Sequence, residues 1–332
     1  MTNTPLKSFS VFFSPSLVCY NRTTCSVAMG LSSWWIAILS LAMVSSPVAL
    51  GFRRLHRGRG IYQPLRLSTT SATSSPFDFA PYKGDFPAVT SLQWKLLEAL
   101  ALKLYNWNAK VNLISRKDID SLVPNHIVPC LSISQLRVFQ QGESIIDVGS
   151  GGGLPGLPTA IVCPDAQFTL LDSNTKKMMV VQEIATSLGL RNVRVICDRA
   201  EKINEKFDFM LGRSVSAVPT FLGFSSHFID EKSEVASKPH LPTGVSIGSG
   251  LLYIKGGDFT DELQEAGVQA HHLFPVSDLI PSIVSEKNVL YIPSAEIVSF
   301  HRRKSIQEKE ASMANSKTVK SAKRPPKKDG TA

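Results

Sequence analysis

The chain has 332 residues and a formal net charge of +9, from 36 lysines and arginines against 27 acidic residues. The charge is unevenly distributed, because residues 1–77 and 302–332 each carry +7, which leaves −5 for residues 78–301. The basic balance therefore does not by itself indicate a nucleic-acid-binding fold, and that argument needs local clusters of cations. Five cysteines without a C-x-x-C pair exclude a disulfide framework and do not support a structural metal site.

Residues 1–77 have the composition of a targeting leader and contain no acidic residue. The apolar run Trp34–Val44 is short for a membrane span, which needs about 20 residues, and is typical of a signal-peptide core. Small residues follow, then Phe52, a cluster of arginines and a stretch rich in serine and threonine. This order resembles the bipartite leaders of plastid proteins in algae with secondary plastids. We expect a disordered or removed leader and a mature protein in the plastid (chloroplast stroma) without stable membrane association, with a mitochondrial leader or a membrane anchor as alternatives.

The rest of the chain divides into a folded part, residues 78–301, and a tail, residues 302–332. The tail is rich in lysine, serine, alanine and proline, and its few large apolar residues predict disorder. It is either a sequence-independent RNA-binding arm or a solvated extension without function. Within the folded part, residues 78–141 are predicted to be mainly helical, because Thr90 and Gln93 fit a capping box and apolar residues then recur at helical spacing.

From residue 142 to 301 the pattern changes to alternating strands and helices. Short apolar strands are predicted at Ile145–Gly149, Phe168–Asp172, Val193–Cys197, Phe207–Leu211, Gly250–Lys255 and Asn288–Ile292. This alternation predicts an α/β fold with a mostly parallel, doubly wound sheet, in which ligands bind at the carboxyl ends of the strands. The polar stretch 230–250 has no apolar period and is predicted as a surface loop insertion.

The strongest local signal is the segment Asp147–Gly156, with the sequence D-V-G-S-G-G-G-L-P-G directly after the first predicted strand. Its glycines allow a sharp turn and a close approach of backbone N–H groups to a ligand, because no Cβ intervenes. Asp172 ends the second strand, where a carboxylate can accept hydrogen bonds from two ribose hydroxyls. The glycines also satisfy the dinucleotide fingerprint of an NAD-dependent dehydrogenase, but Asp147 favours the D-x-G-x-G-x-G form found in Rossmann-like methyltransferases.

An ordered series of motifs makes the chain similar to one family. The series is Trp107-Asn108-x-Lys110-x-Asn112-Leu113, His126-Ile127, Asp147 to Gly156, Leu170-Leu171-Asp172-Ser173, Lys176-Lys177, Gly189-Leu190-x-Asn192-Val193, Arg199-Ala200-Glu201, Gly212-Arg213-Ser214 and Lys255-Gly256. Together these motifs resemble the bacterial small-subunit rRNA guanine-N7 methyltransferases, also called glucose-inhibited division protein B. The resemblance implies a Rossmann-like class I methyltransferase fold with an N-terminal helical extension and S-adenosylmethionine as cofactor. It also implies methyl transfer to N7 of a guanine in 16S-type small-subunit rRNA, either free or in a ribosomal particle.

The resemblance further implies roles for single residues. The implied cofactor-binding positions are Gly149, Gly151, Gly153, Leu154, Asp172, Ala200, Glu201 and Arg213. Of these, Arg213 would lie near the reacting centre, where we expect it to position the reactants without acting as acid or base. Basic positions around the mouth of the site, which would contact RNA phosphates or be ordinary surface charge, are Lys176, Lys177, Arg199, Lys255 and Lys287.

His126 also matches the family, either as a structural histidine or as a substrate contact. Where the family commonly has His-x-x-Asp-Ser, this chain has Pro129 and Cys130, so the carboxylate that would pair with the histidine is missing. No acid–base pair is evident, which is consistent with the implied reaction, because guanine N7 has an in-plane lone pair and no proton to remove. A methyltransferase of another substrate and a non-catalytic RNA-binding protein of the same fold stay open as alternatives.

Overall fold

The computed structural model describes residues 77–230 and 245–322, with side chains up to residue 314 at the carboxyl-terminal end. Nearly all of the predicted leader, most of the predicted insertion over residues 230–250 and the last ten residues lie outside the described residues. Within the described ranges, no helix is both long enough and apolar enough to span a membrane.

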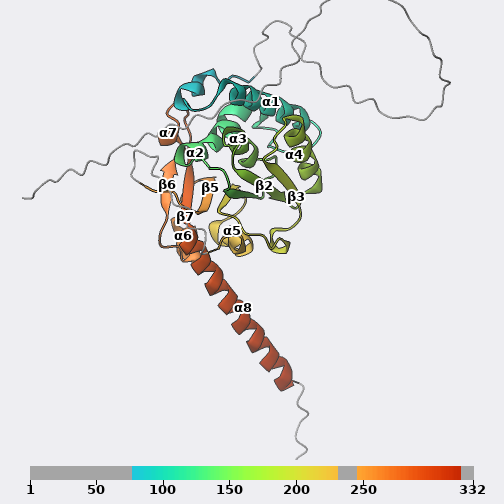
Figure 1. Ribbon diagram of the computed structural model, residues 1–332. Coiled ribbons are helices and arrows are strands. Elements are labelled where there is room, and N and C mark those ends of the chain that lie inside the picture. Colours follow the sequence, from blue (N-terminus) through green and yellow to red (C-terminus); the bar gives the residue numbers. More distant parts are fainter. Residues whose placement is uncertain (1–76, 231–244, 323–332) are drawn as a thin grey trace, which may run out of the picture. The chain divides into compact units, whose positions relative to one another are not determined.

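A seven-stranded sheet with the order β3-β2-β1-β4-β5-β7-β6 forms the centre of the fold (Figure 1). The parallel strands are β1 (Ser144–Val148), β2 (Gln167–Asp172), β3 (Val193–Cys197), β4 (Phe209–Arg213) and β5 (Gly250–Gly256). β7 (Lys287–Pro293) runs antiparallel to both β5 and β6 (His272–Pro275). This is the class I methyltransferase fold, and the predicted doubly wound sheet is confirmed.

Two predictions about the strands need correction. The fourth strand was expected at Phe207–Leu211, but β4 covers Phe209–Arg213, so Arg213 belongs to the strand itself and pairs with Ile254 of β5. β6 was not predicted, because its four residues are mostly exposed and have no apolar run longer than Leu273 and Phe274. The antiparallel β7 has a consequence for function, since its first residue, Lys287, lies at the carboxyl edge of the parallel strands.

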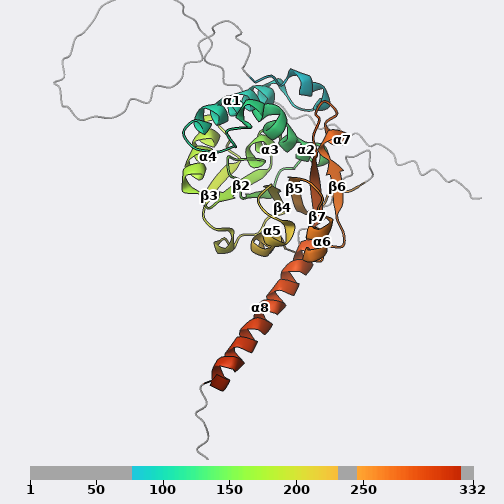
Figure 2. The same ribbon diagram turned by 180° about the vertical axis from the view of Figure 1, so that it is seen from behind.

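Helices cover both faces of the sheet (Figure 2). One face packs against α1 (Ser91–Asn108), α2 (Val128–Leu136), α3 (Gly156–Val162), α4 (Thr175–Ser187) and the short α7 (Val276–Leu279). The other face packs against α5 (Val218–Ser225), α6 (Thr260–Ala266) and the start of α8 (Ser294–Ala322). Consecutive strand residues alternate between the two layers, as Ile145 and Ile146 do in β1, because successive side chains of a strand point to opposite faces.

The predicted N-terminal helical extension consists of α1, α2 and three short helical turns. The turn η1 (Ala80–Asp85) precedes α1, and η2 (Ile119–Ser121) and η3 (Val123–Ile127), the latter a turn of π-helix, lie between α1 and α2. The capping box at the start of α1 is confirmed, since the Thr90 hydroxyl accepts from the Gln93 N–H and the Gln93 side chain accepts from the Thr90 N–H. The extension reaches the carboxyl edge of the sheet through η3, because Arg213 at the end of β4 donates to the carbonyls of Asn125 and His126.

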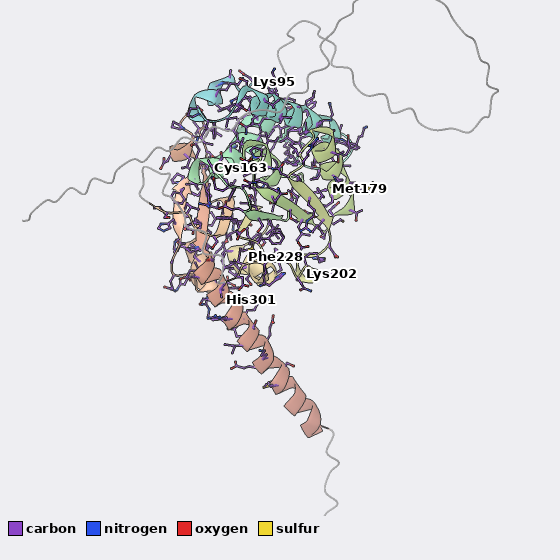
Figure 3. All side chains as sticks on the ribbon, viewed as in Figure 1. Lys95, Cys163, Met179, Lys202, Phe228 and His301 are labelled. Carbon is purple, nitrogen blue, oxygen red and sulfur yellow. The ribbon has the colours of Figure 1, made fainter. Side chains whose placement is uncertain are left out.

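The prediction of a disordered tail over residues 302–332 is wrong for residues 302–322, which continue α8 without a break. The helix is anchored by Ile297, which is fully buried, and by the His301 ring, whose Nδ1 lies 3.2 Å from the hydroxyl of Ser226 next to Phe228 (Figure 3). Arg303 donates to the carbonyl of Ala266 at the end of α6, and Lys304 donates to the carbonyl of Gly223 in α5. Cations are favoured at such helix ends, so two basic residues of the tail serve the fold.

The side chains of residues 306–314, the last that the structure describes, are all exposed. Lys304 and Glu308 form an ion pair of 3.5 Å with the i,i+4 spacing that supports exposed helices, and Ile306 is 56% exposed. The small apolar surface of the tail does not predict this helix. Lysine, glutamate and alanine have high helix propensity, which does not require a core.

We expect Ile297→Ala to lower the free energy of unfolding by about 2–5 kcal/mol, because it leaves a cavity under α8. Ile306→Ala on the same helix is the matched control and should change it by less than about 0.5 kcal/mol, since that side chain is exposed. Urea unfolding followed by circular dichroism measures both values. Equal effects at the two positions would contradict the described docking of α8.

Candidate active site

The glycine loop after β1 is held in a tight turn by its neighbours. Gly149, Gly151 and Gly153 have φ values of 71°, 56° and 85°, which lie in the left-handed region that favours glycine. The N–H groups of Gly149 and Ser150 both donate to the carbonyl of Leu171 in β2, at 2.8 and 3.0 Å. The loop is therefore tied to the adjacent strand at its start.

Asp147 holds the other end of the loop. Its Oδ2 accepts from the Ser150 hydroxyl at 2.8 Å and from the Gly156 N–H at 2.9 Å, while its Oδ1 has no partner among the described residues. Complete burial raises the pKa of this carboxyl to about 6, and the two hydrogen bonds oppose the shift. A Cβ at Gly156 would meet Oδ2 at 2.7 Å, so a glycine is required there. Asp147 thus braces the loop from beneath and does not line the cavity above it.

A cavity of about 240 Å³ opens beside the loop at the carboxyl ends of β1, β2 and β3. Its lining is Val148, Gly149, Leu171, Asp172, Ser173, Asp198, Arg199, Ala200, Glu201, Val215 and Phe224. The Asp172 carboxylate is fixed at the rim, because Oδ2 accepts from the Gly151 N–H at 2.9 Å and Oδ1 accepts from the Asn174 N–H at 2.8 Å. Each oxygen keeps a lone pair for a further donor, which suits the two hydroxyls of a ribose.

A second cavity of about 650 Å³ shares Gly149, Asp172 and Val215 with the first, so the two are continuous. Its other lining residues are Leu113, Ile114, Ser115, Asp118, Asn125, His126, Ser150, Gly151, Gly152, Leu154, Lys177, Arg213, Ser214 and Lys287. The extension and the glycine loop both line this cavity, and they meet where Leu113 packs against Gly152. Its lining has three basic side chains, those of Lys177, Arg213 and Lys287, and two acidic ones, those of Asp118 and Asp172. This cavity is therefore the more basic of the two.

The residues present fit S-adenosylmethionine. A Cβ at Gly151 would meet nothing closer than 3.9 Å, so the space above this glycine is open to a ligand. The apolar and carboxylate lining of the smaller cavity suits an adenosine, and the larger cavity offers Lys177 to a ligand carboxylate. Of the eight predicted cofactor positions, all but Gly153 line the joined cavities. Gly153 faces the helical layer instead, where a Cβ would meet Leu157 at 2.5 Å.

Arg213 is clamped to the extension. Its guanidinium donates to the carbonyls of His126 and Asn125, at 2.7 and 3.0 Å, and Nη2 lies 2.9 Å from Nδ1 of His126. Lys287 donates to the same Asn125 carbonyl at 2.9 Å. Burial, followed by the charges of Arg213 and Lys287, lowers the pKa of His126 to about 4. The histidine therefore has an arginine as its partner in place of an acid, and the buried thiol of Cys130 donates to its carbonyl.

The five predicted RNA-contact residues do not share one environment. Lys177 and Lys287 line the larger cavity and Arg199 lines the smaller one, whereas Lys176 is exposed and lines neither. Lys255 is ion-paired with Glu262, and its ammonium lies 5.6 Å from the centre of the Phe259 ring, so it is engaged within the fold.

The sequence did not single out Asn125, Asp118 or Val215 as lining residues. Asn125 and Val215 lie next to predicted motifs, at His126 and Ser214, and this adjacency was the only signal for them.

Comparison with known proteins points to one group. The family model described as rRNA small subunit methyltransferase G matches residues 93–237. The Ribosomal RNA small subunit methyltransferase G of Christiangramia forsetii is 38% identical over 209 residues, which is 63% of this chain and 93% of the relative. The protein of the same name from Flavobacterium psychrophilum is 42% identical over 180 residues, 54% of this chain and 81% of the relative. A solved SAM dependent methyltransferase from Aquifex aeolicus matches 53% of this chain and 95% of its own, at 18% identity and a TM-score of 0.36, too distant to bear on function.

We expect Gly151→Val to abolish S-adenosylmethionine binding, because the branched side chain would enter the open space above the loop. Gly189→Val is the matched control, since Gly189 also has positive φ (70°) and open space around it but lies away from both cavities. Both variants carry the same backbone strain, so only the first should lose binding in isothermal titration calorimetry. Unimpaired binding by Gly151→Val would show that the ligand does not lie over this loop.

Proposed function

This chain belongs to the rRNA small subunit methyltransferase G family, and we propose that it transfers a methyl group from S-adenosylmethionine to N7 of a guanine in 16S-type small-subunit rRNA. The observation that carries the proposal is the joined cavity at the carboxyl edge of the sheet. It has a glycine loop and a ribose-binding carboxylate at one end and a basic wall at the other. The cofactor supplies an electrophilic methyl group on a sulfonium, and the chain supplies binding and alignment.

N7 methylation requires cofactor binding and alignment of the reactants, and the residues of the site can supply both without a general base. In this proposal Asp172 would hold the ribose, Ala200 and Glu201 would contact the adenine, and the glycine loop would border the methionine end; all of them line the two cavities. No residue needs to take a proton, because N7 carries none, so the work of the chain is to bring N7 to within about 3–3.5 Å of the methyl carbon. The apolar wall formed by Leu113 and Ile114 limits water on one side of the larger cavity.

The RNA is bound through local charge. The body carries −5 over residues 78–301, so its overall field does not attract a polyanion. Lys177 and Lys287 line one cavity, where they would contact RNA phosphates near the reacting atoms, while Arg213 beside them is bonded to η3. A guanine in a single-stranded loop can be splayed out into a cavity of this size, which is the common mode of sequence-specific RNA recognition.

We expect the recombinant full chain to introduce 7-methylguanosine into small-subunit particles or their free rRNA when incubated with labelled S-adenosylmethionine. Mapping by primer extension after borohydride and aniline cleavage locates the base, and Gly151→Val provides the inactive control. Labelling of another base, or of protein alone, would exclude the proposed reaction. Labelling of free rRNA but not of particles, or the reverse, identifies the form of the substrate.

We also propose that the protein works in a plastid, supported by the acid-free leader with its apolar core, Phe52 and arginine cluster. Residues 1–77 fused to a fluorescent protein should direct it to the plastid of an alga with secondary plastids. Replacing Arg53, Arg54, Arg57 and Arg59 with glutamate should abolish plastid import, because the transit portion depends on positive charge. A fusion found in mitochondria, or retained in the cytosol or the endoplasmic reticulum, would contradict this localisation.

A further inference from the structure

One nitrogen of the larger cavity's lining, Nε2 of His126, makes no hydrogen bond within the described part of the fold. The His126 ring lines this cavity together with Arg213 and the glycine loop, and its Nδ1 is occupied by the Arg213 guanidinium. No described residue bonds to its Nε2, and this nitrogen is not among the described atoms that are both buried and unpaired, so it is accessible to a ligand or to solvent.

We propose that His126 donates a hydrogen bond from Nε2 to O6 of the target guanine and so selects guanine, with Arg213 as the positioning residue that fixes the donor. This inference rests on the proposed function, because O6 lies beside N7 on the same edge of the base.

The hydrogen bond from Arg213 determines which nitrogen of His126 carries the proton. A guanidinium has only donors, so the nitrogen that lies 2.9 Å from Nη2 has to accept. A neutral imidazole that accepts at Nδ1 carries its proton at Nε2. Arg213 is itself held by two backbone carbonyls of η3, so the Nε2–H donor of His126 is fixed relative to Arg213 and to the backbone of η3.

A donor at this place separates the two purines. Guanine presents two acceptors on this edge, N7 and O6, whereas adenine presents the acceptor N7 beside an amino group that donates. A fixed N–H opposite the amino group of adenine would face another donor, and both would lose their hydrogen bonds to water. The penalty for such an unpaired polar group is larger than the gain from a matched one.

Charge explains why a neutral imidazole suits this position. The purine becomes positively charged as N7 acquires the methyl group, so a cationic donor on O6 would repel the product and weaken the nucleophile. The pKa of His126 is lowered to about 4 by burial and by Arg213 and Lys287, opposed by Asp118, and the ring is therefore neutral at physiological pH. Arg213 stays charged, but its Nη1 and Nη2 groups point their donors at η3.

The test removes O6 from the base and Nε2–H from the enzyme, singly and together. The substrate is small-subunit rRNA with either guanosine or 2-aminopurine at the target position, since 2-aminopurine keeps N7 and the 2-amino group but has hydrogen in place of O6 and no proton on N1, a second difference that the comparison with His126→Ala separates from the first. The wild-type protein should lose about 10- to 100-fold in kcat/KM with 2-aminopurine. His126→Ala should lose a similar factor with guanosine, and only a small further factor with 2-aminopurine.

Matched variants separate the donor from the fold. His126→Gln places an amide N–H near the position of Nε2 and should keep most of the preference for guanosine, whereas His126→Asn reaches only the position of Nδ1 and should lose it. Arg213→Ala should reduce the preference for guanosine over 2-aminopurine, because the His126 ring is then no longer held with its proton at Nε2. If His126→Ala does not fold, the comparison of the Gln and Asn variants decides.

The outcomes separate a failure of the proposed function from a failure of the role of His126. Absence of 7-methylguanosine with the wild-type protein would overturn the proposed function itself. Wild-type methylation without a preference over 2-aminopurine, or the same preference in His126→Ala and His126→Asn as in the wild type, would overturn the role of His126 alone.

Discussion

The site depends on a single buried carboxylate beneath the glycine loop. Asp147 joins the two ends of the turn through Ser150 and Gly156, and no other side chain in the described part of the chain bonds to both. Burying this charge is unfavourable, as the pKa of about 6 shows, and one oxygen has no compensating partner. A neutral side chain would be less costly to bury. The carboxylate is therefore explained by the loop geometry that it imposes, which leaves the space above Gly151 open to a ligand.

The second half of the site comes from outside the doubly wound core. Parallel strands bring Asp172 and Arg213 to one edge because their carboxyl ends coincide there, and the reversed β7 adds Lys287 from its amino end. The N-terminal extension then closes the cavity through Leu113 and His126. The π-helical turn η3 leaves the carbonyls of Asn125 and His126 available, and the two cations bind there. The extension is thus part of the active site as well as a support for the sheet.

The sequence predicted the parts of this arrangement that follow from local rules. The capping box, the glycine loop and the strand-ending Asp172 depend on short segments and were all predicted correctly. Predictions failed where long-range packing decides. β6 exists only because β7 offers it an edge. The prediction for Gly153, by contrast, failed for a local reason, because Leu157 in the first turn of α3 packs against it. The partner of His126 is Arg213, 87 residues away, and no spacing in the sequence indicates such a pair.

Fewer cations are available to RNA than the sequence suggests, because the fold itself engages several of them. Lys255 pairs with Glu262, Arg303 and Lys304 bind the ends of α6 and α5, and Arg213 binds η3. Of the cations identified from the motifs, those that line the cavities are Lys177, Arg199, Arg213 and Lys287. An acidic body with a few cations at one edge attracts a phosphate backbone only at short range, where screening by salt is weakest. Such a distribution favours contact at the reacting centre over binding elsewhere on the domain, which is the behaviour that a single-site modification of a large RNA requires.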